Sequence, residues 1–155
     1  MTNRVISTRS KNYNIKIMNI LYYNIMNILV ISSLFFIINC IVAYSYGYII
    51  YSLLFLLLFI SSTLTHSFEY YLFSIIDRMI IYSIVFYGGY ILYKKNPDPV
   101  MLIIIISTFI IVCKLWIYGY MTNNYCFHKE SKIKVFYHAC MHIISSIGHL
   151  LIVIV

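Results

Sequence analysis

The sequence predicts an all-α membrane protein, a polytopic bundle of about five transmembrane helices, on three observations. Of its 155 residues, 63% are apolar or aromatic and only 10% are charged, whereas a soluble domain is roughly one quarter charged. The mean hydropathy is +0.90. The apolar residues also form runs long enough for helices that cross a bilayer, which takes about 20 residues. Strands of a membrane barrel would alternate apolar and polar residues, and the run at 101–106 does not alternate.

The apolar runs and their interruptions predict where each span lies. Residues 21–66 carry no charged side chain, and this stretch is long enough for two spans with a tight turn near 43–47. Residues 94–99 contain two prolines and three charged side chains, which cannot form helix in lipid, so they predict a loop. A second polar loop is expected over 122–134. The other three spans are expected over about 71–93, 100–120 and 135–155.

Two kinds of span follow from this division. The first, second and fourth spans look apolar all round, which predicts helices that face lipid. The third and fifth spans carry an aspartate and several histidines instead.

The ends of the chain and its basic residues predict orientation. Residues 1–19 are polar and basic with no acidic side chain, and we interpret them as a cytoplasmic tail before an uncleaved anchor. Residues 20–155 then form a single transmembrane domain. Five spans place the tail and the last loop on one side of the membrane and Lys94 and Lys95 on the other. The first side carries more basic residues: Arg4, Arg9, Lys11, Lys16, Lys129, Lys132 and Lys134.

The excess of basic residues predicts a cytoplasmic N-terminus and a lumenal or extracellular C-terminus. The net charge of +7 is explained by the same flanking positions, and no nucleic acid is expected as a partner.

Ionisable residues at membrane depth are costly and usually mark function. His66 ends the second span, Asp77 lies about two turns into the third, and His138 and His142 begin the fifth. The parity of the spans puts all four at the cytoplasmic end, where they can converge. His138 and His142 are spaced i, i+4, so they project from one face of a helix, and Ser62 and His66 repeat this spacing.

Three imidazoles from two helices, with a carboxylate nearby, match a catalytic zinc site in which a fourth position is left for water. In this interpretation Asp77 holds or deprotonates the water. Ser62 does not touch the metal but forms a hydrogen bond to a group that does. Two simpler interpretations remain open: histidines at span ends act as interfacial anchors, and Asp77 pairs with Arg78. Three interpretations are open for His149: it lines the same cavity, forms a hydrogen bond with another span, or is a further metal ligand.

The order Ser62-x3-His66, then Asp77, then His138-x3-His142 resembles the signature of the CREST superfamily of membrane hydrolases. This group includes alkaline ceramidases, hemolysin III proteins, and progestin and adipoQ receptors. The resemblance implies that His66, His138 and His142 bind zinc, while Asp77 and Ser62 surround the water held by the metal.

Some features resemble one subfamily and some resemble others, and the number of spans departs from the superfamily pattern. The gap between His66 and Asp77 is similar to that in alkaline ceramidases. The segments 77–82 and 138–142, with Gly148 further on, look more like hemolysin III and the receptors. Members of the superfamily have seven core spans, so two spans between the aspartate helix and the final helix are missing here. Removing two spans preserves parity, so the site can still assemble.

These observations lead to the hypothesis of a zinc-dependent membrane hydrolase of a lipid amide or ester, similar to a ceramidase, with membrane lipids as substrates. The water held by zinc would be the nucleophile. The alternative is a non-catalytic multi-pass protein of the same fold, a receptor-like or membrane-remodelling factor. A proton- or metal-conducting bundle ranks third, because the polar groups gather at one side of the membrane.

Overall fold

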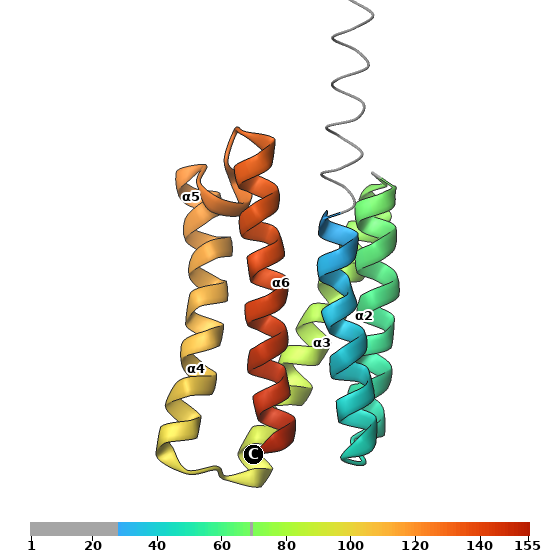
Figure 1. Cartoon of the computed structure of the whole chain (residues 1–155), viewed down its shortest axis with the longest axis vertical. Coiled ribbons are helices and arrows are strands. Elements are labelled where there is room, and N and C mark those ends of the chain that lie inside the picture. The colour runs from blue at the N-terminus through green and yellow to red at the C-terminus, as the bar shows by residue number, and fades with distance from the viewer. Residues whose placement is uncertain (1–27, 69) are drawn as a thin grey trace, which may run out of the picture.

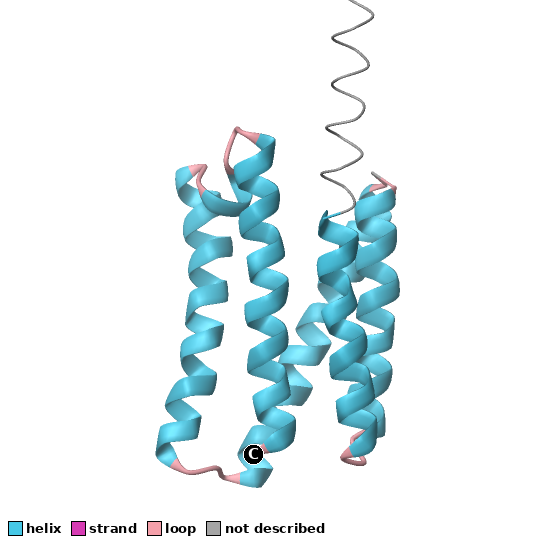
Figure 2. Ribbon diagram, viewed as in Figure 1, coloured by secondary structure: helices cyan, strands magenta, loops and turns pink. Residues whose placement is uncertain are grey.

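The structure is a computed structural model that describes residues 28–68 and 70–155; the predicted tail lies outside this range. Five helices in it are long and apolar enough to cross a membrane, and they run alternately up and down (Figure 1). There is no strand in the described ranges (Figure 2). The predicted all-α bundle is confirmed, and the chain is a multi-pass membrane protein. The spans are Ile28–Ser45, α2 (Ile49–Ser67), α3 (Tyr71–Lys95), Pro99–Thr122 and α6 (Ser131–Ile154).

Two of the connections are tight, and local chemistry explains both. Gly47 adopts φ +79° between the first helix and α2, a left-handed conformation that costs glycine little. Asn96 ends α3 in the same region of backbone space, with φ 46°. The carboxylate of Asp98 then accepts hydrogen bonds at 2.9 and 3.2 Å from two backbone amides in the first turn of the next helix. Pro99 begins that helix, where its missing N–H is no loss.

The fourth span consists of three consecutive segments: α4 (Pro99–Cys113), the π-helical turn η1 (Lys114–Tyr118) and α5 (Gly119–Thr122). Single π-helical turns inside a longer helix occur frequently near functional sites. A 3-10 turn, η2 (Tyr125–Phe127), leads from this span towards α6. Because α6 begins at Ser131, the last loop is shorter than predicted: the basic first turn of α6 is helical and not part of the loop.

The helices pack in a definite order. α2 packs along α3, α4 packs along α6, and α3 also contacts α6 (Figure 1). The first helix is joined to α2 and α6 by buried hydrogen bonds between side chains. The first helix, α2 and α6 therefore share one interior face, and His66, His142 and His149 lie on it.

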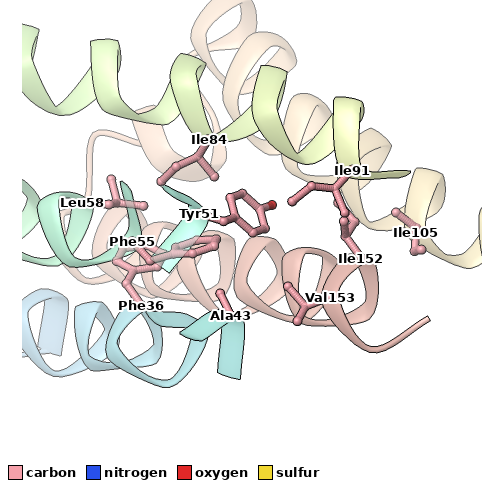
Figure 3. Close-up of a cluster of buried hydrophobic side chains, with 10 residues drawn as sticks. All are labelled: Phe36, Ala43, Tyr51, Phe55, Leu58, Ile84, Ile91, Ile105, Ile152 and Val153. Carbon is pink, nitrogen blue, oxygen red and sulfur yellow. The ribbon is translucent and has the colours of Figure 1, made fainter. Parts of the chain in front are cut away.

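Tyr51 of α2 lies at the centre of the buried core (Figure 3). Its ring centroid is 4.7 Å from that of Phe55 and 5.6 Å from that of Tyr87. The Tyr51 hydroxyl lies 2.5 Å from Nδ1 of His149 on α6. Lipid tails are as apolar as the core, so close packing and hydrogen bonds of this kind hold the helices together. The remaining buried residues of this cluster come from all five spans: Phe36, Ala43, Leu58, Ile84, Ile91, Ile105, Ile152 and Val153.

The prediction that the first, second and fourth spans are apolar all round is wrong for the first two. Serine can donate its hydroxyl to its own helix backbone, as Ser32 and Ser33 do to the carbonyl of Leu29, so an apolar run tolerates it. The same serines still present oxygen atoms to the interior. In α4, by contrast, only Ile105 is buried, as expected for a lipid-facing helix. The buried polar residues of the first two spans are Ser32, Ser33, Asn39, Ser52, Ser61 and Ser62.

Gly88 and Gly89 of α3 provide a matched test of this packing. A Cβ at Gly88 would lie 2.5 Å from the Tyr51 hydroxyl, whereas a Cβ at Gly89 would meet nothing within 4 Å. We expect Gly88→Ala to lower the midpoint of thermal unfolding in detergent, because overpacking costs about 1–3 kcal/mol and His149 holds the Tyr51 hydroxyl in place. Gly89→Ala should preserve or raise the midpoint, because alanine is the better helix former by about 1 kcal/mol. Equal shifts for the two variants would contradict this account.

Candidate metal centre

His66, His138 and His142 come together at one end of the bundle. Their ring centroids are 4.8 to 5.5 Å apart. One ring nitrogen from each lies within 4.8 Å of the others. In the ranges 28–68 and 70–155, this is the only group of three or more metal-capable side chains.

The alternation of the helices explains this convergence. His66 lies in the last turn of α2, and α2 ends at the same end of the bundle at which α6 begins (Figure 1). His138 and His142 occupy successive turns of α6, so their rings lie on the same side of that helix. His142 is the more deeply placed of the two and is only 7% exposed.

The donor set fits a zinc ion. Tetrahedral zinc with bonds of about 2.0–2.1 Å holds neighbouring nitrogens roughly 3.4 Å apart. The nitrogens of the cluster lie within 4.8 Å of one another, so they are close to this spacing. Three histidines also leave one tetrahedral position for a water molecule or a substrate.

Asp77 of α3 lies outside the histidine group, with its carboxylate towards α2. Oδ1 accepts a hydrogen bond of 2.7 Å from Ser61 Oγ. The guanidinium group of Arg78 instead lies over the ring of Trp116, 5.9 Å from its centroid. Within the described part of the chain no ion pair joins Asp77 to Arg78, so the simpler interpretation of Asp77 is not what the geometry favours.

Ser62, the serine of the Ser-x3-His pattern, faces the first helix. It is 1% exposed, and its Oγ lies 3.0 Å from Ser33 Oγ. Because Ser33 donates its single hydrogen to the Leu29 carbonyl at 3.0 Å, Ser62 is the donor of the pair. Ser62 can therefore accept a hydrogen bond from a water molecule but has no hydrogen left to donate to one. Ser61, which the pattern did not select, is the serine that contacts the aspartate.

The contribution of the first helix was missed at the level of sequence. Ser32 Oγ lies 2.9 Å from Nδ1 of His142, and the ring of Phe36 packs 5.1 Å from the imidazole centroid. The sequence does indicate this face: residues 32, 36 and 39 are spaced so that they lie on one side of a helix. Two of these three are polar and lie within a mostly apolar run, which should have predicted an interior face.

His149 bonds another span, which was one of the three interpretations open for it. Its Nδ1 pairs with the Tyr51 hydroxyl at 2.5 Å. Its ring is surrounded by aromatic rings, at 5.4 Å from Phe55 and 4.9 Å from Phe109 between centroids. His149 is not in the histidine group. This packing favours a structural tie over a step in a conducting pathway.

Aromatic rings from the last loop and the π-helical turn border the cluster. Trp116 lies in η1, and its ring centroid is 6.3 Å from that of His138 and 5.0 Å from that of Phe127. The irregular turn thus carries a large ring beside one of the histidines, and the guanidinium group of Arg78 lies over that ring.

The fold and the cluster together define a class: a multi-pass helical membrane protein with a candidate metal centre at one end of the helical bundle. No protein-family model, curated protein or solved structure matches the chain. The resemblance to the CREST superfamily therefore remains a prediction from the residues quoted above.

Proposed function

We propose that this protein is a membrane-embedded, zinc-dependent hydrolase of a lipid amide or ester. The observation that carries the proposal is the convergence of His66, His138 and His142 from two helices. Structural zinc sites are closed by four protein ligands, whereas catalytic sites keep three and leave one position open. The resemblance to the CREST superfamily supports the same conclusion independently of the distances.

The three histidines would hold the zinc ion, which when bound polarises the acyl carbonyl and activates water. Asp77, held towards α2 by Ser61 at 2.7 Å, would accept the proton that the water loses. The water oxygen adds to the acyl carbon, and the C–N or C–O bond breaks. Asp77 then returns the proton to the departing amine or alcohol, so that the products are a fatty acid and the remainder of the lipid.

The depth of the cluster supports a lipid as the substrate. His66 lies one residue before the end of α2, and His138 lies about two turns into α6, whose first turn carries Lys132 and Lys134. The cluster is therefore close to the boundary between headgroups and hydrocarbon, since basic side chains gather at that boundary. The amide and ester linkages of membrane lipids lie at the same depth, because they join the headgroup region to the acyl tails.

Zinc content is the first test of the proposal. Wild-type protein purified in detergent should contain about one zinc ion per chain, since three ligands and one water complete a tetrahedral site. The double variant His138→Ala, His142→Ala should lose it, as measured by elemental analysis. His128→Ala is the matched control, because His128 lies in the last loop outside the cluster. Absence of zinc from the wild type, or retention by the double variant, would exclude the proposed site.

Turnover is the second test. In lipid–detergent micelles the protein should release fatty acid from a long-chain ceramide or a phospholipid. Asp77→Asn should slow the release by about 10²–10⁴-fold while zinc is retained, because general acid–base groups contribute that much. Ser83→Ala is the control on the same helix, since that hydroxyl is exposed and bonds its own backbone. Bound zinc without release from any of these substrates would contradict a hydrolase and favour a non-catalytic factor of the same fold.

We also propose that the metal centre lies at the cytoplasmic end, with the C-terminus lumenal or extracellular. Within residues 28–68 and 70–155, Lys129, Lys132 and Lys134 lie at that end with the histidines, and Lys94 and Lys95 lie at the other. In a bacterial host, a C-terminal alkaline phosphatase fusion should be active and a C-terminal green fluorescent protein fusion should be dark. The reverse pair of results would invert the assignment.

A further inference from the structure

Ser32 of the first helix makes two polar contacts that together constrain a hydrogen atom. Its Oγ lies 2.8 Å from the carbonyl oxygen of Leu29 and 2.9 Å from Nδ1 of His142. The residue is only 4% exposed, so both contacts are enclosed by the protein. Water is therefore not expected to replace either partner.

A hydroxyl group has one hydrogen to donate, and a carbonyl oxygen can only accept. If Ser32 gave its hydrogen to Nδ1, two oxygen atoms would lie 2.8 Å apart with no hydrogen between them. Both contacts are satisfied only when Ser32 donates to Leu29 and accepts from Nδ1–H of His142. The neutral imidazole then carries its hydrogen on Nδ1 and its free lone pair on Nε2.

Packing fixes the same ring from a second direction. Phe36 lies one helical turn after Ser32 on the first helix, and its ring centroid is 5.1 Å from that of His142, tilted by 55°. Phe36 is itself 4% exposed. The hydrogen bond to Ser32 and the aromatic contact with Phe36 together restrict rotation of the imidazole.

We propose that Ser32 is a positioning residue that holds His142 in the Nδ1–H tautomer and thereby presents Nε2 to the metal. Ligating histidines generally donate their second ring N–H to a partner of this kind, which orients the ring and tunes its basicity. Across residues 28–68 and 70–155, His142 is the one member of the cluster whose second nitrogen has such a partner. The first helix, which supplies no ligand to the cluster, would in this way control one of the three.

The tautomer can be measured without any metal. Nitrogen-15 NMR of metal-free protein labelled on histidine, at about pH 8 where histidine is ordinarily neutral, should show a protonated Nδ1 and an unprotonated Nε2 for His142. His142→Gln identifies the signals by their loss. Ser32→Ala should shift the ring towards the Nε2–H form that free histidine prefers in water, and Ser32→Thr should restore the native form. An Nε2–H form of His142 in the wild type would overturn the proposal.

The consequence for metal binding rests on the proposed zinc site and is tested separately. Ser32→Ala should weaken zinc binding by about 10–100-fold, as loss of such a partner generally does, and Ser32→Thr should recover it. Ser45→Ala is the control on the same helix, because Ser45 is exposed and bonds only its own backbone at 2.9 Å; it should leave zinc affinity unchanged.

The two measurements separate the possible failures. If wild type binds no zinc but shows the Nδ1–H tautomer, the proposed function fails while the hydrogen-bond assignment stands. If Ser32→Ala changes the tautomer but leaves zinc affinity unaltered, the positioning role is overturned while the zinc site stands.

Discussion

Hydrogen bonds between the first helix, α2 and α6 are the constraint on which the rest of the structure depends. In lipid, apolar side chains gain little by leaving one apolar surface for another, whereas a buried polar atom without a partner is costly. The described part of the bundle contains several buried polar side chains, and most of them are paired between spans. Ser32 pairs with His142 and Ser33 with Ser62. Further along, Ser146 donates to Asn39, and Tyr51 pairs with His149.

The same face of α6 carries both the candidate metal centre and these ties. His138, His142, Ser146 and His149 follow one another at intervals of four, four and three residues, so they form a single stripe. His138 and His142 each offer one ring nitrogen to a ligand, while Ser146 and His149 are bonded to the first helix and to α2. Rotation of α6 about its axis would therefore break the ties and disperse the cluster at once. This coupling explains how so small a bundle can hold three imidazoles in one place.

Much of the architecture and part of the site could be predicted from the sequence. The convergence of His66 with His138 and His142 follows from counting spans, because alternate crossings return the chain to the same end of the bundle. The partner of Asp77 could not be predicted in this way. Ser61 and Ser62 are adjacent and chemically identical, and a shift of one residue turns a side chain by about 100° around the helix. Only the packing of α2 against α3 and the first helix decides which of the two meets the aspartate.

The sequence by itself determined the fold class, the five spans and the breaks at Gly47 and around Asp98. Each of these depends on a local property of the chain. Hydropathy sets the spans, glycine permits the positive φ at Gly47, and proline with a capping carboxylate sets the break around Asp98. The tertiary structure decided which face of each helix is interior, and hence that Ser32 and Ser33 belong beside the histidines. A serine in an apolar run can form a hydrogen bond with its own helix backbone or with a neighbouring helix, and the sequence does not distinguish these two cases. That choice is made by the rotation of each helix against its neighbours, which is a property of the assembled bundle.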